Sequence, residues 1–320
     1  MGLAAVILLS LACPLANPAE PPDPTVGVGR VTGFLVPLWP PSLKAFYPEG
    51  KTDDKKVREA LEGAIEAMSG SSTKTWLGAT FHPNDRVGIE TDCAWPHVTM
   101  LLLDVLIDEL VRAGVSPDNI YVFGSDEREV YSAGLSVRRE GRGVKVMGAG
   151  SEGFRNGLTR VVLDYCDAII NISRLKVDKR LGLWGCLANY SNLVDVPDRM
   201  AIWKESERLC QLAARPTVRT KVRLQLMDAL QPAYDLWEDK QAPPRWPYGA
   251  VVASRDPVAA DIFGWKLLEA YRAKTKGQAW LLDPVPTYLT DASAAYHITR
   301  ATVDDLPIVW KGIEEDALLK

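Results

Sequence analysis

The segment from Arg86 to Gly124 constrains the fold more than any other part of the sequence. R-V-G-I-E (86–90) predicts a short strand, Pro96 to Ala113 carries apolar residues at helical spacing, and N-I-Y-V-F-G (119–124) predicts a second strand. Two strands joined by one helix in this way lie parallel in the same sheet. The segment therefore predicts an α/β fold.

Further strands are predicted along the rest of the chain, together with an amphipathic helix from Thr52 to Gly70. The strand segments are V-K-V-M (144–147), D-A-I-I-N-I (167–172), K-V-R-L-Q-L-M-D (221–228) and G-A-V-V-A-S (249–254). A composition of 47% hydrophobic and 24% charged residues is that of a packed globular protein. We expect a mainly parallel or mixed sheet, flanked by helices on both faces, in one domain over residues 30–320.

The N-terminal segment has a different character. Residues 2–16 form an apolar run that is too short to span a bilayer, and a proline-rich stretch follows. We interpret 1–19 as a signal peptide or apolar leader and 20–29 as a linker, which predicts export to the periplasm or the extracellular space. The alternative is a membrane anchor, and this leader would be the chain's only contact with a membrane.

Charge and metal-binding residue types exclude several functions. The net charge of -4, with both signs interspersed, gives no basic surface for a nucleic acid. The cysteines after the leader form no C-x-x-C pair, the three histidines have no metal-ligand spacing, and no G-x-G-x-x-G follows a strand. We expect buried free thiols, and the sequence identifies neither a metal nor a cofactor.

Polar residues gather where the predicted strands end. They include Glu90 and Asp92, then Arg174 and Lys176, then Asp228, then Asp256 and Asp261. Sheets of this kind bind ligands beyond the carboxyl ends of their strands, so we expect these groups at one rim. The structural alternative is that they are helix caps and ion pairs; Asp256 stands where an N-cap belongs, directly before Pro257.

Seven segments, in order, carry a family resemblance. They are E-G-A-I-E-A-M-S-G, H-P-N-D-R-V-G-I, L-V-R-A-G-V-S-P-D-N-I-Y-V, D-A-I-I-N-I-S-R-L-K, L-A-N-Y, A-R-P-T-V-R-T-K-V-R-L-Q-L-M-D-A-L and S-R-D-P-V-A-A-D. From about residue 52 to 300 the chain resembles the domain of unknown function 362 family. The resemblance implies an α/β fold, and it also implies export, because members of this family often carry a twin-arginine signal. Some relatives are fused to ferredoxin modules, and this chain has none.

The polar positions match the family less well than the framework does. The family pattern has Lys and Asn after the first strand, where this chain has Glu90 and Asp92, and a Lys-Asn pair where this chain has Ala188 and Asn189. Leu175 and Lys176 match, as do Asp228, Asp256 and Asp261. The pattern indicates a diverged member.

Three hypotheses about function follow. The first is an enzyme or small-molecule-binding protein with its site at the strand ends. The second is a binding or scaffold protein that kept the fold and lost the polar site. The third, from a faint similarity of residues 89–115 to nickel-pincer racemases, is an enzyme of that kind. For the first, the expected catalytic residues are Lys176, Asp228 and Asp261, and the expected ligand-binding residues are Asn189, Asp256, Arg174, Glu90, Asp92 and His97.

Overall fold

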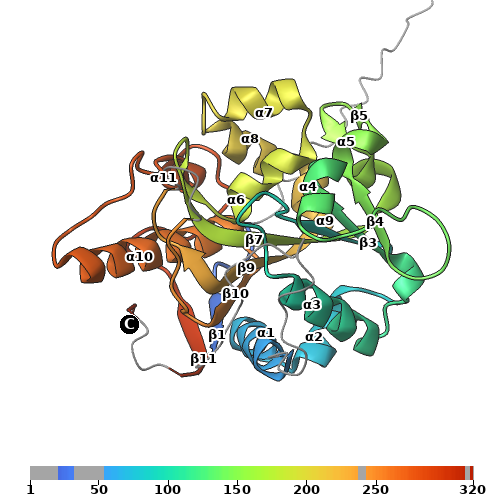
Figure 1. Ribbon diagram of the computed structural model, residues 1–320, viewed down its shortest axis with the longest axis horizontal. Helices are drawn as coiled ribbons and strands as arrows, with labels where there is room; N and C mark the ends of the chain where they lie inside the picture. Colours follow the sequence, from blue (N-terminus) through green and yellow to red (C-terminus); the bar gives the residue numbers. More distant parts are fainter. Residues whose placement is uncertain (1–20, 32–53, 237–242, 314–317, 320) are drawn as a thin grey trace, which may run out of the picture.

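A nine-stranded sheet runs through the middle of the protein (Figure 1). The computed structural model describes residues 21–31, 54–236, 243–313 and 318–319. The strand order is β11-β1-β10-β9-β7-β2-β3-β4, with β8 paired to the end of β7. A separate two-stranded ribbon is formed by β5 and β6. The strands are β1 (Val26–Arg30), β2 (Val87–Thr91), β3 (Ile120–Gly124), β4 (Lys145–Gly148), β5 (Phe154–Arg155), β6 (Leu158–Thr159), β7 (Ala168–Asp178), β8 (Gly182–Trp184), β9 (Val222–Ala233), β10 (Ala250–Ser254) and β11 (Ile308–Gly312).

Helices cover both faces of the sheet, as predicted (Figure 1). On one face, α1 (Asp54–Ser69), α2 (Thr73–Thr80) and α3 (Met100–Arg112) bury their apolar sides against every second residue of the central strands. On the opposite face lie α6 (Cys186–Asn189), α8 (Arg208–Ala214), α10 (Pro257–Lys276) and α11 (Tyr288–Ala294). The remaining helical elements are α4 (Glu127–Ser132), η2 (Pro117–Asn119), α5 (Ala149–Glu152), η3 (Val161–Tyr165), η4 (Tyr190–Leu193), α7 (Val196–Ile202) and α9 (Pro216–Lys221).

The two glycines of β1 determine how closely α1 packs against this strand. A Cβ atom added to Gly27 would lie 2.1 Å from the carbonyl oxygen of Ala64, and one added to Gly29 would lie 1.9 Å from that of Ala60. Only glycine therefore permits α1 to lie directly on the backbone of β1. The alternation V-G-V-G places Val26 and Val28 on the other face, where both are fully buried.

Two predicted boundaries are wrong. Residues 26–29, assigned to the linker, belong to β1, which lies between β10 and β11 inside the sheet. The helix expected from Pro96 begins instead at Met100, with Thr99 at its N-cap. Residues 1–19, the predicted leader, lie outside the described part of the chain. Within that part, no helix is long and apolar enough to cross a membrane.

The direction of β10 decides which side chains share an end of the sheet. Strands β4, β3, β2, β7 and β9 are mutually parallel, as the strand–helix–strand pattern predicted. β10 is antiparallel to β9, with Ser254 opposite Gln225 and Ala250 opposite Ala229. The carboxyl end of β10 therefore lies where β9 begins, at the opposite end of the sheet from the carboxyl ends of β2, β7 and β9.

Candidate functional site

The expected catalytic lysine is held by three acceptors at the carboxyl end of β7. Lys176 Nζ lies 2.8 Å from Asp92 Oδ2 and donates to the carbonyl oxygens of Ala94 and Pro96, each at 3.1 Å. Both charged side chains are buried. The lysine thus neutralises Asp92 and fixes the loop after β2.

A second buried ion pair lies beside the first. Arg174 Nη1 is 3.2 Å from Asp228 Oδ2, and the same oxygen accepts the backbone N–H of Thr99 at 2.7 Å. The other oxygen of Asp228 accepts the N–H of Leu230 at 3.0 Å. Asp228 therefore joins β9 to β7 and to the N-terminus of α3, and both of its carboxylate oxygens have structural partners.

His97, an expected ligand-binding residue, is buried at the same end of the sheet. Its Nδ1 lies 2.7 Å from the carbonyl oxygen of Val98, and its Nε2 has no hydrogen-bond partner among the described residues. Burial lowers the pKa of His97, and the positive charge of Arg174 adds to that shift. The imidazole is accordingly neutral at pH 7.

Glu90 lies near the carboxyl end of β2, and its side chain is on the opposite face of the sheet from that of Ile89. It lies in register with Asn171 on β7, which lies in register with Gln225 on β9. Both carboxyl oxygens are buried without a described hydrogen-bond partner, and burial raises the pKa of Glu90 well above its usual value, with the charge of Asp92 adding to the rise. Burial therefore favours the protonated form of Glu90.

Asp256 does not reach this rim, and Asn189 contacts it through Asn171 and Ile172 of β7. Asp256 follows β10 and so lies at the other end of the sheet, where it accepts the N–H groups of Val258 and Ala259 at 2.8 and 3.1 Å and the hydroxyl of Thr299. It is the N-cap of α10, as the sequence predicted. Asn189 lies in α6 and donates to Asn171 at 2.7 Å.

Asp261 has the structural role that the sequence did not reveal. Its carboxylate accepts the backbone N–H groups of Cys186 and Leu187, at 2.5 and 3.0 Å, and so holds α6 to α10. Gly185 permits this approach, because a Cβ atom there would lie 2.3 Å from Asp261 Oδ1. Burial raises the pKa of Asp261 to about 7.

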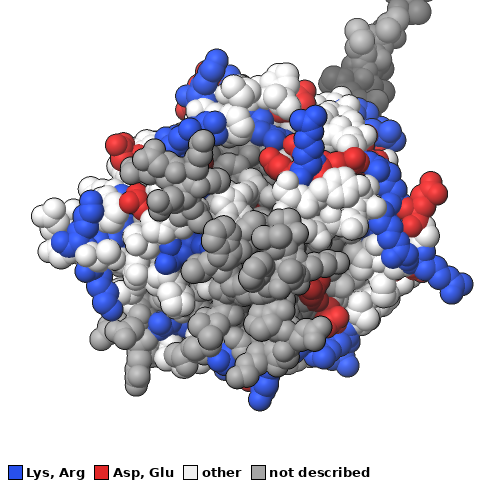
Figure 2. Space-filling view, in the orientation of Figure 1, with Lys and Arg blue, Asp and Glu red and all other residues white. Residues whose placement is uncertain are grey.

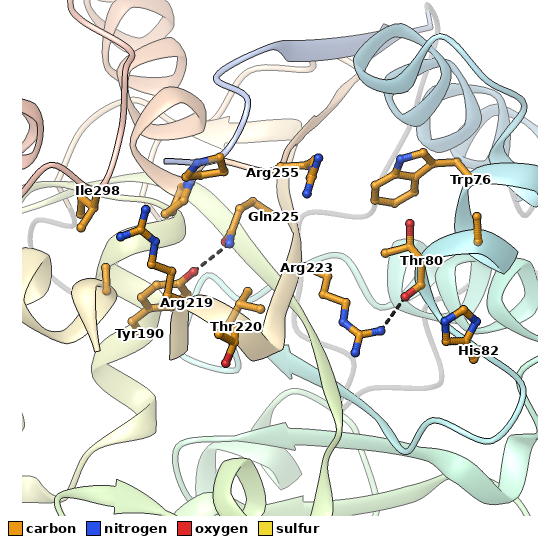
Figure 3. A pocket seen from close by; sticks show the side chains of 15 residues that line it. Trp76, Thr80, His82, Tyr190, Arg219, Thr220, Arg223, Gln225, Arg255 and Ile298 are labelled. Atoms are coloured by element: carbon orange, nitrogen blue, oxygen red, sulfur yellow. Dashed lines mark hydrogen bonds between the residues drawn. The ribbon is translucent and has the colours of Figure 1, made fainter. Parts of the chain in front are cut away.

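A cavity of about 550 Å³ lies instead at the opposite end of the sheet, where β9 begins and β10 ends (Figure 3). We call it the arginine pocket. Its lining residues come from α2, η4, α8, α9, β9 and the start of α10, and from the segments before β1, after α2, between β10 and α10, and after α11. They are Pro22, Trp76, Ala79, Thr80, His82, Tyr190, Ala213, Arg219, Thr220, Val222, Arg223, Gln225, Arg255, Pro257 and Ile298.

The three arginines of the arginine pocket are compensated unequally. Arg223 Nη1 donates to the carbonyl oxygen of Thr80 at 2.6 Å and to Asp85 at 2.8 Å (Figure 3). Arg219 has a buried Nη2 without a hydrogen-bond partner among the described residues. Arg255 is exposed and also lines a smaller adjoining cavity with Asp23, whose pKa is lowered mainly by hydrogen bonds from Thr25 and further by the charge of Arg255.

Tyr190 and Gln225 form a polar part of the pocket wall. Gln225 Nε2 donates to the Tyr190 hydroxyl oxygen at 2.7 Å, and both side chains are buried (Figure 3). Trp76 supplies an aromatic surface across the pocket. The pocket therefore combines guanidinium donors with aromatic walls.

Sequence reasoning missed this pocket although its residues stand in the segments that carry the family resemblance. His82 belongs to H-P-N-D-R-V-G-I, Tyr190 to L-A-N-Y, Arg219 and Arg223 to A-R-P-T-V-R-T-K-V-R-L-Q, and Arg255 to S-R-D-P. The available signal was the concentration of arginines in these segments. The rule that ligands bind beyond the carboxyl ends of parallel strands indicates the other end of the sheet.

The cysteines and surface charges agree with their predicted character. Cys93, Cys166, Cys186 and Cys210 are buried free thiols. No group of three or more potential metal ligands is present among the described residues. On the face shown in Figure 2, acidic and basic side chains are interspersed around the edge of the described surface.

Comparisons with known proteins give a match to a family model over part of the chain and several distant structures. No curated protein matches the chain. A protein from Thermotoga maritima is 14% identical with a TM-score of 0.33, over 63% of this chain and 56% of that one. The lactate racemase apoprotein from Thermoanaerobacterium thermosaccharolyticum is 14% identical with a TM-score of 0.33, over 55% of this chain and 48% of that one. This chain thus spans about half the length of the solved structures it matches.

The family comparison covers the part of the chain that forms most of the arginine pocket. Residues 142–266, which include Tyr190, Arg219, Gln225 and Arg255, match the sequence model of a domain of unknown function, DUF362. This match confirms, over residues 142–266, the resemblance to the DUF362 family that the sequence predicted.

Proposed function

We propose that this protein binds an anionic small molecule in the arginine pocket. The observation that carries the proposal is the composition of the wall: its fifteen residues include three arginines and a histidine but no aspartate or glutamate. Arg223 is paired with Asp85, but Arg219 and Arg255 have no ion pair among the described residues. Their like charges in a concave site repel each other, and a bound anion relieves that repulsion. A volume of about 550 Å³ is within the range of small-molecule sites.

The donors define the chemical class of the ligand. A guanidinium group offers paired N–H donors that match the oxygens of a carboxylate or a phosphate. Arg219 has an unused buried donor, whereas Arg223 is engaged by Thr80 and Asp85. Trp76 and Tyr190 add flat apolar surface, so we expect a carboxylate or phosphate ester that also carries an apolar or ring portion.

The test is binding of defined anions to the purified chain. Inorganic phosphate, phenyl phosphate and benzoate are titrated by calorimetry, and the melting temperature is followed at increasing concentration, since a ligand of the folded state raises it. We expect Arg219→Ala to weaken binding by about tenfold or more, because it removes a charged hydrogen-bond donor.

Arg128→Ala is the matched control, because Arg128 is exposed on α4, lies outside the pocket wall and carries the same charge. Equal affinities of the Arg219→Ala and Arg128→Ala variants would show that only the net charge matters. That result, or the absence of binding by any of the anions, would contradict the proposal.

The second candidate is the strand-end site that the sequence predicted. The observation in its favour is the buried Nε2 of His97, which has no described partner beside the Arg174–Asp228 and Lys176–Asp92 pairs. A ligand there would have to compete with these pairs for Lys176 or Arg174. The Arg219→Ala variant separates the candidates, because a ligand of the strand-end site retains its affinity in it.

We also propose export, on the apolar run of residues 2–16 and the proline-rich stretch that follows it. Mass spectrometry of the mature protein tests it: loss of the first ~19 residues is expected from signal-peptide dimensions, and a chain that keeps Met1 in the cytoplasm would contradict it.

A further inference from the structure

A chain of buried side-chain amides ends in the wall of the arginine pocket. Asn192 donates to Asn189 at 2.9 Å, and Asn189 donates to Asn171 at 2.7 Å. Asn171 donates to Gln225 Oε1 at 2.8 Å, and Gln225 Nε2 donates to the Tyr190 hydroxyl at 2.7 Å. The chain crosses the covered face of the sheet from η4 to the beginning of β9.

Backbone carbonyls fix the direction of these bonds. Asn171 Nδ2 also donates to the carbonyl oxygen of Cys186 at 2.8 Å, and Asn189 Nδ2 also donates to that of Ile172 at 3.4 Å. A carbonyl oxygen can only accept a hydrogen bond, so the side-chain atom that faces it in each asparagine must be the amide nitrogen. Gln225 must therefore accept from Asn171 with its amide oxygen and donate to Tyr190 with its amide nitrogen.

This orientation leaves the phenolic hydrogen of Tyr190 unused by Gln225. A hydroxyl group has one hydrogen to donate, and here its oxygen is the acceptor. No described residue accepts a hydrogen bond from Tyr190, and burial raises the pKa of its hydroxyl well above the usual value, so the group keeps its hydrogen. Both Tyr190 and Arg219 line the same cavity.

We infer that Tyr190 donates a hydrogen bond to an oxygen of the ligand in the arginine pocket, so that the site selects an oxyanion with acceptor oxygens for both Tyr190 and Arg219. This inference rests on the proposed function and adds a specificity-determining residue to it. It predicts that a ligand presenting a hydroxyl or amine hydrogen at Tyr190 is disfavoured, because that hydrogen would face another donor.

The test uses inorganic phosphate as the probe and calorimetry at pH 7 with the full chain. Tyr190→Phe is expected to weaken phosphate binding by about five- to twentyfold, the range for a lost hydrogen bond to a charged group. Replacing Tyr190 with 3-fluorotyrosine strengthens the donor at the cost of one added atom, and is expected to tighten binding by about two- to fivefold. A purely structural tyrosine would change the melting temperature in both variants and leave the phosphate affinity unchanged.

The outcomes separate this inference from the proposed function. If phosphate binds and Arg219→Ala weakens it, but Tyr190→Phe and the fluorinated variant bind as the unmodified chain does, Tyr190 is not the donor and the pocket stands. Weaker binding of the fluorinated variant would also overturn the inference, because it would make Tyr190 an acceptor. If the unmodified chain does not bind phosphate, phenyl phosphate or benzoate, the proposed function itself fails. Should Tyr190→Phe not fold, the sign of the change in the fluorinated variant decides alone.

Discussion

The two ends of the sheet differ in how many of their lysine and arginine side chains have a carboxylate partner. At the carboxyl ends of β7 and β9, Lys176 and Arg174 each meet a buried carboxylate, Asp92 and Asp228. In the arginine pocket, Asp85 pairs with Arg223, while Arg219 keeps a buried donor without a described partner. Removing one partner of a buried ion pair is strongly destabilising because it leaves the other charge buried and unpaired. A donor at a cavity wall that lacks a partner is instead available to a ligand.

Breaking the buried pair should give the largest effect on stability. Asp228→Ala removes the carboxylate partner of Arg174 and the acceptor of the Thr99 N–H. We expect the free energy of unfolding to fall by about 3–5 kcal/mol, as for removal of one partner of a buried pair. Urea denaturation measures it, provided that the variant still folds.

An exposed pair of the same chemistry serves as the control. Asp167 and Arg86 are 2.8 Å apart and both are more than 40% exposed. Asp167→Ala should cost no more than about 1 kcal/mol, because solvent screens the pair. Equal losses in the two variants would contradict the distinction between a structural end and an open end of the sheet.

The pH dependence of stability should show a smaller effect at the pocket end. Burial raises the pKa of Asp256 to about 6, so the folded protein holds this proton more tightly than the unfolded chain does. Its contribution to stability is full below about pH 4 and is lost as the pH rises through about 6. Asparagine caps a helix as well as aspartate does, so Asp256→Asn keeps the cap and removes the titration.

The measurement is the difference in unfolding free energy between the unmodified chain and Asp256→Asn, at several values between pH 4 and 7. We expect it to shift in favour of the variant by about 1–3 kcal/mol over that range. A constant difference would mean that Asp256 has the same pKa in the folded and unfolded chains.

The smallest effect is expected for Arg255→Ala. Arg255 is exposed, and a surface substitution changes stability by about 0.5 kcal/mol or less. The melting temperature without ligand should therefore stay unchanged, while the affinity for phosphate falls. A large loss of stability would make Arg255 a structural residue and weaken the contrast between the two ends.

Local features of the fold were predictable because short-range rules determine them. The spacing of Val57, Leu61 and Ile65 identified α1, all three are fully buried, and Asp256 before Pro257 identified the start of α10. The strand–helix–strand pattern identified the parallel arrangement of β2 and β3. The helix start at Met100 was missed, and β1 was missed because its glycines favour α1 packing rather than a recognisable strand pattern.

The candidate site was predicted only in part, because the sequence does not show in which direction each strand runs. The sequence brought Asp92, Arg174, Lys176 and Asp228 to one rim, where they do lie together. It added Asp256 on the assumption that β10 runs parallel to β9, and periodicity does not encode strand direction. The sequence also could not show that Asp261 accepts hydrogen bonds from the N–H groups of Cys186 and Leu187, since these residues lie some 75 positions away along the chain.

The sequence by itself thus determined the class of fold, the main helices and strands, and the family segments that later formed the pocket wall. Tertiary structure alone decided which charges are neutralised and which face a cavity. The physical reason is that propensity, periodicity and capping act over a few residues. Charge compensation depends instead on partners that only the folded chain brings within hydrogen-bonding distance. Arg174 reaches the carboxylate of Asp228, although its Nε has no described partner, whereas Arg219 has no carboxylate partner among the described residues.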